Sequence, residues 1–160
     1  MEIRNARRDD MPELMKIYEG ARRFMRAFGN PTQWVNGYPA EELLLSDIAG
    51  DNLYVGTQEG EILCVFAMFG GEDPTYRKID GAWVNDRPYL TIHRIASSGK
   101  KAKVADEVFA WAWKILPNLR IDTHEDNLPM QNCLKRNGFV YCGTIYLENG
   151  DPRRAYQKSE

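Results

Sequence analysis

The feature that most constrains the fold is the stretch YLTIHRIASSGKKAKV at positions 89–104. Its first half is a run of apolar and β-branched residues, which predicts a buried strand. Small residues at 96–99 interrupt this run, and a helix is predicted to follow directly over residues 101–116. A strand, a turn of small residues with lysines, and a helix form the local arrangement that binds phosphate through backbone N–H groups. The stretch therefore predicts an anion site, the alternative being a solvated surface turn.

The remaining segments place this stretch in a single α/β (α+β) domain over residues 1–160. With the next predicted strand, at 119–123, the stretch forms a strand, helix, strand unit, which predicts a parallel crossover. Further strands are predicted at 1–6, 53–57, 61–69, 139–147 and 153–157, and further helices from Asp9 or Asp10 to about Gly29, over 40–49, and from Asn127 to about Arg136. Residues 70–87 are predicted to be a long polar loop, a kind of segment that is often functional.

Composition excludes several classes of protein. Hydrophobic residues make up 43% of the chain and the net charge is −2, which fits neither a disordered chain nor a strongly basic nucleic-acid binder. The three cysteines, Cys64, Cys133 and Cys142, have no CxxC spacing, which argues against a disulfide framework and a metal site. The charged N-terminus and the lack of a long apolar run argue against a signal peptide and a membrane span. We therefore expect a cytoplasmic protein with no nucleic-acid or membrane partner and no metal.

A second motif lies near the C-terminus. Asn127 opens a predicted helix that ends at Gly138 and Phe139. This spacing, together with the order of elements, resembles the GCN5-related N-acetyltransferase (GNAT) superfamily over the whole chain. The resemblance implies the acyl-CoA N-acyltransferase fold: a mixed, mostly antiparallel sheet of about seven strands, splayed between strands 4 and 5 and flanked by about four helices. In the family this asparagine lies beside the pantetheine arm of coenzyme A. The same side chain could also cap the helix, and both roles can hold at once.

The predicted phosphate turn departs from the family pattern. After its fourth strand the family carries Arg/Gln-x-x-Gly-x-Gly/Ala, and the matching positions here are Lys100, Lys103 and Ala105. Lys100 keeps a positive charge, Lys103 replaces a glycine, and only Ala105 fits. A third position departs as well, because Leu134 stands where many members have a tyrosine that protonates the leaving thiolate. The residues that the resemblance implies for binding acetyl-CoA are His93, Arg94, Ile95, Ser98, Gly99, Lys100, Lys101, Lys103, Val104, Ala105, Asn127 and Asn132.

Acyl transfer to an amine requires a base for the amine proton and a donor for the developing oxyanion. His93 is the best candidate base, since histidine changes charge near neutral pH and the predicted strand alternation places its side chain with Thr91 and Ile95. It could equally be a structural strand histidine. Glu125 follows a strand end, where ligands gather in open sheets, or it could be a helix-start acid. Tyr76, Tyr141 and Tyr146 could supply the missing acid, or they could simply be packed. Tyr76 is the most interesting of them because it lies in the long loop.

An aromatic surface is predicted for the acyl acceptor. Its residues are Phe28, Trp34, Tyr76 and Trp83. Acidic residues near the last two suggest a cationic amine, although the aromatic residues could instead belong to the core. The expected function is an acetyl-CoA-dependent N-acetyltransferase that moves an acetyl or short acyl group to a primary amine of a small molecule or peptide. The alternative is an inactive module of the same fold that binds acyl-CoA and acts through protein contacts. The last strands offer an edge for a homodimer.

Overall fold

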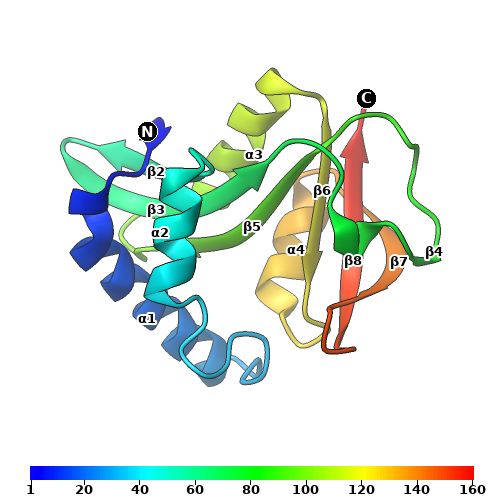
Figure 1. The fold of residues 1–160 in the computed structure, drawn as a ribbon, viewed down its shortest axis with the longest axis horizontal. Helices are drawn as coiled ribbons and strands as arrows, with labels where there is room; N and C mark the ends of the chain where they lie inside the picture. The colour runs from blue at the N-terminus through cyan, green and yellow to red at the C-terminus, as the bar shows by residue number, and fades with distance from the viewer. The chain divides into compact units, whose positions relative to one another are not determined.

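The alternating and apolar runs form one mixed sheet in this computed structural model, which describes all residues 1–160 (Figure 1). Its strand order is β1-β2-β3-β5-β6-β8-β7-β4. The strands are β1 (Glu2–Asn5), β2 (Leu53–Gln58), β3 (Glu61–Phe69), β4 (Asp80–Gly81), β5 (Leu90–Ser97), β6 (Asn118–Thr123), β7 (Val140–Tyr146) and β8 (Pro152–Ser159). The helices are α1 (Met11–Ala27), α2 (Glu41–Ala49), α3 (Val104–Ile115) and α4 (Leu128–Arg136), with short 3-10 helices η1 (Arg8–Asp10) and η2 (Pro74–Tyr76). The predicted mixed sheet and four helices are confirmed, with eight strands in place of about seven.

The chain divides into two compact units, which we describe separately. The first contains Met1–Met68 and His93–Val108, and the second contains Phe69–Ile92 and Phe109–Glu160. Strand β5 and helix α3 therefore contribute residues to both units. The expectation of a single domain over residues 1–160 stays a prediction.

In the first unit, β1, β2 and β3 form an antiparallel sheet. Helix α1 buries Leu14, Ile17 and Tyr18, which recur at helical spacing, and α2 buries Leu44. Strand β3 is a nearly continuous run of apolar residues, and most of them are buried. The periodicities that predicted these elements are therefore the ones that build this unit.

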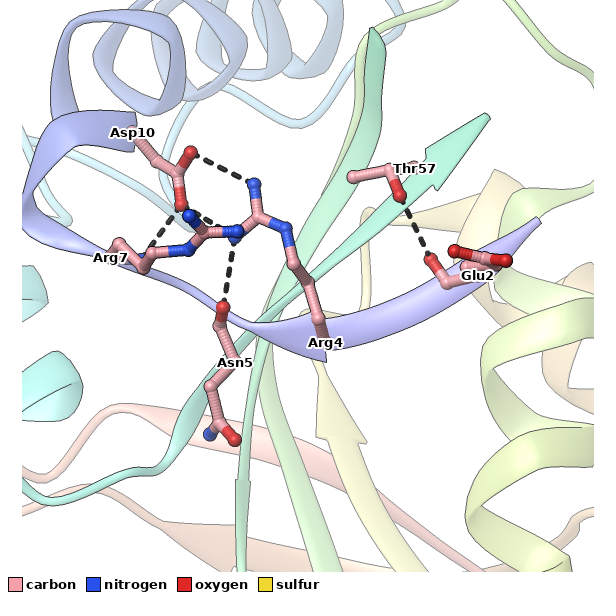
Figure 2. Close-up of polar contacts among 6 residues, drawn as sticks. All are labelled: Glu2, Arg4, Asn5, Arg7, Asp10 and Thr57. Carbon is pink, nitrogen blue, oxygen red and sulfur yellow. Dashed lines mark hydrogen bonds and ion pairs between the residues drawn. The ribbon is translucent and has the colours of Figure 1, made fainter. Parts of the chain in front are cut away.

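The start of the chain is held by one bidentate ion pair (Figure 2). Arg4 Nη1 and Nη2 donate to Asp10 Oδ2 and Oδ1 at 2.8 and 3.0 Å, and the Arg7 backbone N–H donates to Asp10 Oδ2 at 2.7 Å. The hydrogen bond to Arg4 lowers the pKa of Asp10. Asp10 stands at the N-cap position of α1, as predicted, but its carboxylate bonds backwards to Arg7 and makes no hydrogen bond to the helix it precedes.

In the second unit, β5 begins in parallel with β6, and β8 lies between β6 and β7 (Figure 1). The short strand β4 pairs with β7. Gly81 and Gly143 make this approach possible, since a Cβ on either would lie 2.2 or 2.1 Å from a backbone oxygen of the facing strand. This close contact explains why glycines stand at both positions.

Three predictions about the elements are wrong. Residues 70–87 are not without regular structure, because they contain η2 and β4. The last strands do not form the edge of the sheet: β8 is interior, and β4 covers part of β7 at Gly143 and Thr144. Helix α3 begins at Val104 and not at Lys101, because Lys103 has a left-handed backbone with φ +60°.

Candidate functional site

Strand β5 contributes residues to both units. It pairs with β6 in parallel at Leu90 and Thr91, and it continues to Ser97 in the first unit. Arg94, in the middle of β5, has a φ of +55°. A left-handed residue interrupts the alternation of side chains along a strand. We expected Thr91, His93 and Ile95 to share one face of the strand. Because Arg94 interrupts the alternation, this expectation does not hold for Ile95, which follows it.

Arg94 is the centre of a polar cluster in the first unit. Its Nε and Nη2 both donate to Asp47 Oδ2, at 3.1 and 2.8 Å, and Nη1 donates to the Tyr38 hydroxyl at 3.3 Å. Tyr18 donates from its hydroxyl to the Arg94 carbonyl oxygen at 2.7 Å. Burial lowers the pKa of Arg94, but Tyr38 and Asp47 outweigh it and leave this pKa raised. Sequence reasoning missed these three partners, because they lie 47 to 76 residues away along the chain.

The turn after β5 offers backbone donors. Ser98 N–H is already bonded to Leu63 O at 2.9 Å, but the N–H groups of Lys101, Ala102 and Lys103 have no acceptor within the protein. Lys103 has φ +60° at the position where the resembled family has glycine. The backbone thus keeps the glycine conformation without the glycine, and free donors precede α3 as an anion site requires.

The lysines of this turn differ in their partners. Lys100 Nζ is hydrogen-bonded to Glu61, which raises the pKa of Lys100. Lys101 Nζ lies 2.9 Å from Glu107 Oε2. The Lys103 ammonium is exposed and forms no ion pair. Lys103 is therefore the one cation of the turn that needs no other bond to break before it can meet a phosphate.

The other predicted residues of the first unit differ in burial. His93, Ile95 and Ala105 are half-buried, and Val104 is buried. Gly99 has φ +82°, and its N–H donates to Ser97 Oγ at 3.0 Å.

Two predicted acceptor residues also belong to the first unit. Phe28 is 61% exposed and stacks on Phe24, with their ring centroids 4.4 Å apart. Trp34 is half-buried, and its ring lies edge-on to Tyr18 at 5.7 Å. Phe28 therefore presents an apolar ring to solvent. Trp34 packs against Tyr18, whose hydroxyl is bonded to the Arg94 carbonyl oxygen.

In the second unit, Asn127 caps α4 as predicted, since its Oδ1 accepts from Met130 N–H at 3.2 Å. Glu125 and Asn132 are exposed, which keeps both side chains available to a ligand. Leu134 is fully buried in the core. A proton donor is therefore absent at the position where many family members place their tyrosine.

Tyr76 and Trp83 pack together in the second unit. Tyr76 is 1% exposed, and its hydroxyl donates to Asp122 Oδ2 at 2.6 Å. Trp83 Nε1 donates to Tyr76 O at 2.9 Å. Burial raises the pKa of Tyr76 well above its ordinary value. A buried hydroxyl that donates to a carboxylate is poorly suited to protonate a thiolate, so its place argues for a structural role, not the expected catalytic and acceptor-binding roles.

The structure contains no group of three or more His, Cys, Asp or Glu side chains placed to hold a metal ion. None of its helices combines the length and apolar character that a membrane span requires. The three cysteines are free, and burial raises the pKa of the Cys64 thiol to about 11.

Neither a protein-family profile nor a curated protein matches the chain. Solved structures do. A GNAT-family acetyltransferase from Streptococcus agalactiae 2603 superposes with a TM-score of 0.90 and 32% identity, over 99% of this chain and 95% of that chain. A putative acetyltransferase from Staphylococcus aureus Mu50 gives a TM-score of 0.73 and 23% identity, over 99% of both chains. Because the first match combines this identity with nearly complete coverage, the chain belongs to the GNAT family of acetyltransferases.

Proposed function

We propose that the protein transfers an acetyl or short acyl group from its coenzyme A thioester to a primary amine. The observation that carries this proposal is the turn before α3, where three free N–H groups and an unpaired lysine stand at the place of the family's pyrophosphate loop. Two further structures of the same fold support the choice of ligand. One is a GNAT-like decarboxylase, GphF, in complex with isobutyryl-CoA, and the other is the aminoglycoside acetyltransferase AAC(6')-Ib with coenzyme A and kanamycin.

Each step of the proposed reaction is assigned to groups of this chain. The N–H groups of Lys101–Lys103 bind the pyrophosphate, and the backbone of His93–Ile95 binds the pantetheine arm and polarises the thioester carbonyl. His93 accepts a proton from the amine nitrogen as it attacks the carbonyl carbon. The carbon–sulfur bond breaks, and the coenzyme leaves as a thiolate. Because Leu134 replaces the usual tyrosine, this departure depends on solvent or on a group other than the family's common acid.

The acceptor in this proposal is a small molecule or a peptide with a primary amine. The aminoglycoside acetyltransferase supports this choice, since that protein holds kanamycin, although at 14% identity it shares only the fold with this chain. The exposed ring of Phe28 offers apolar contact area for such a molecule.

The first test is whether coenzyme A binds and a thiol is released. Titration of the full chain with coenzyme A should give heat at sub-millimolar concentration, and acetyl-CoA with a broad panel of amines should release free thiol. A His93→Ala variant should lose about a hundredfold or more in turnover, whereas Asp9→Asn, on the exposed surface, should not. Coenzyme binding without thiol release would favour a module that acts through protein contacts. No heat at all would remove the proposal.

The second test separates the lysines of the turn. Lys103→Glu should weaken coenzyme A binding by about tenfold at low salt and by less at high salt, because it reverses the free charge facing the phosphates. Lys100→Gln should weaken it less, since Lys100 is already bound to Glu61. Equal effects of both variants would mean that the turn contributes only general positive charge.

A further inference from the structure

Arg94 carries a backbone strain that the proposed reaction does not by itself explain. It is a non-glycine residue with φ +55° in the interior of β5. This conformation is unfavourable for a residue with a Cβ and persists only where neighbouring groups hold it, often at active sites. Its neighbours in sequence, His93 and Ile95, are the ones whose backbone we assign to the thioester.

Three side chains from three separate segments hold Arg94. Tyr18, from α1, bonds to its backbone carbonyl oxygen at 2.7 Å, and Asp47, from α2, bonds to its guanidinium at 2.8 and 3.1 Å. Tyr38, between these helices, accepts from Nη1 at 3.3 Å. Both the main chain and the side chain of the strained residue are therefore anchored.

The two main anchors are buried, so water does not compete for their bonds. Tyr18 is fully buried, and Asp47 is 5% exposed. Burial raises the pKa of Tyr18 far above its ordinary value, so its hydroxyl stays a donor throughout the neutral and alkaline range. The hydrogen bond to the Arg94 carbonyl oxygen is therefore not lost by deprotonation of Tyr18 in this pH range.

The anchors are also tied to residues 31–39. The ring of Trp34 packs against those of Tyr18 and Tyr38, with centroid separations of 5.7 and 6.2 Å. Arg22 donates to the Tyr38 carbonyl oxygen at 3.2 Å. Residues 31–39 therefore contain one of the three groups that hold Arg94 and pack against a second.

We propose that Tyr18, Tyr38 and Asp47 are positioning residues for acyl transfer. They hold the left-handed turn at Arg94, so that the β5 backbone beside it polarises the thioester carbonyl, and they link this turn to residues 31–39. None of them touches a reacting atom. This inference rests on the proposed function, because it assumes that the β5 backbone meets an acyl-CoA thioester.

The test measures the polarisation of the thioester carbonyl directly and needs no amine acceptor. Acetyl-CoA labelled with carbon-13 at the acetyl carbonyl is bound to the wild type, Tyr18→Phe and Asp47→Asn, and its carbonyl resonance is recorded. The wild type should shift this resonance away from its position in free acetyl-CoA. Each variant should lose about half of that shift or more, while the Kd for coenzyme A changes by less than about threefold. Asp9→Asn, on the exposed surface, is the matched control and should leave both quantities unchanged.

The outcomes separate the two proposals. A wild type that binds no coenzyme A contradicts the proposed function. A wild type that binds acetyl-CoA without a carbonyl shift, or folded variants with the full shift, overturns the positioning role. If both variants unfold, Tyr38→Phe decides, because it removes only one half-exposed hydroxyl: a reduced shift supports the role and an unchanged shift overturns it.

Discussion

Arg94 in the first unit and Arg120 in the second are held in opposite ways. Arg94 in the first unit has a carboxylate partner, and the two side chains are 11% and 6% exposed. Arg120 in the second unit is 4% exposed and forms no ion pair. Its guanidinium lies between the rings of Trp83 and Tyr89, 4.1 and 4.0 Å from their centroids.

The difference appears in their protonation equilibria. Burial lowers the pKa of both guanidinium groups, but only in Arg94 do the neighbours reverse the effect. Arg120 donates from Nη2 to Asn85 O at 2.6 Å, and its Nε has no partner. Arg94 is thus held by directional, charge-assisted hydrogen bonds, which fix the orientation of its guanidinium. Arg120 is held mainly by contact with the faces of two rings, which depends more on its volume than on its orientation. We expect the first arrangement to be intolerant of change and the second to accept an apolar side chain.

The largest effect should follow removal of the carboxylate in the first unit. Asp47→Ala leaves the Arg94 guanidinium buried without its counterion, which should lower the free energy of unfolding by about 3–5 kcal/mol. Urea denaturation at neutral pH measures this loss. Asp9→Ala serves as the exposed control and should change stability by less than about 0.5 kcal/mol.

Arg120 should respond to the loss of volume more than to the loss of charge. Arg120→Ala opens a cavity between two rings and should cost about 2–4 kcal/mol. Arg120→Met fills most of that space without a buried charge, and should cost less than about 1.5 kcal/mol. If the two variants lose the same free energy of unfolding in urea denaturation, the charge of Arg120 and not its volume stabilises this packing. The contrast with Arg94 would then disappear.

A left-handed residue without anchors should behave unlike Arg94. Lys103 has φ +60°, and its side chain holds no partner. Lys103→Gly should therefore raise the free energy of unfolding by about 1 kcal/mol, because glycine adopts this backbone without steric cost. Arg94→Gly should lower stability instead, since it removes the bonds to Asp47. Thermal unfolding of the two variants under identical conditions makes the comparison.

The smallest effect should come from the half-exposed pair of Arg4 and Asp10, which extends the comparison to the surface. The pKa of Asp10 is lowered in the folded state, so its contribution is complete above the unfolded pKa, about 4, and is lost as the pH falls through the folded pKa. Its size should be about 0.5–1 kcal/mol, because Arg4 remains partly solvated. Asp10→Asn should thus destabilise the protein at pH 6, and its effect should shrink as the pH falls through the lowered pKa of Asp10. A difference that persists at low pH would contradict this assignment.

Local patterns carried much of the fold prediction. Helical spacing placed α1, α2 and α4 correctly, and Asn127 is the N-cap that its residue type and position predicted. The boundary of α3 was wrong because a lysine adopts a backbone conformation that its residue type does not signal. Tyr76 was assigned to an open loop because its neighbours in sequence are polar, whereas burial depends on what packs against it from β6.

The sequence by itself therefore determined the order of elements, the cap of α4 and the place of the small-residue turn after β5, because periodicity, capping and turn chemistry act between residues close in the chain. Only the tertiary structure decided how that strand is shaped. No glycine marks the left-handed backbone at Arg94 in the sequence. The groups that hold this residue come from α1, from α2 and from the segment between them. Contacts between residues so far apart exist only once the chain has folded, and they set the geometry of the strand to which we assign the chemistry.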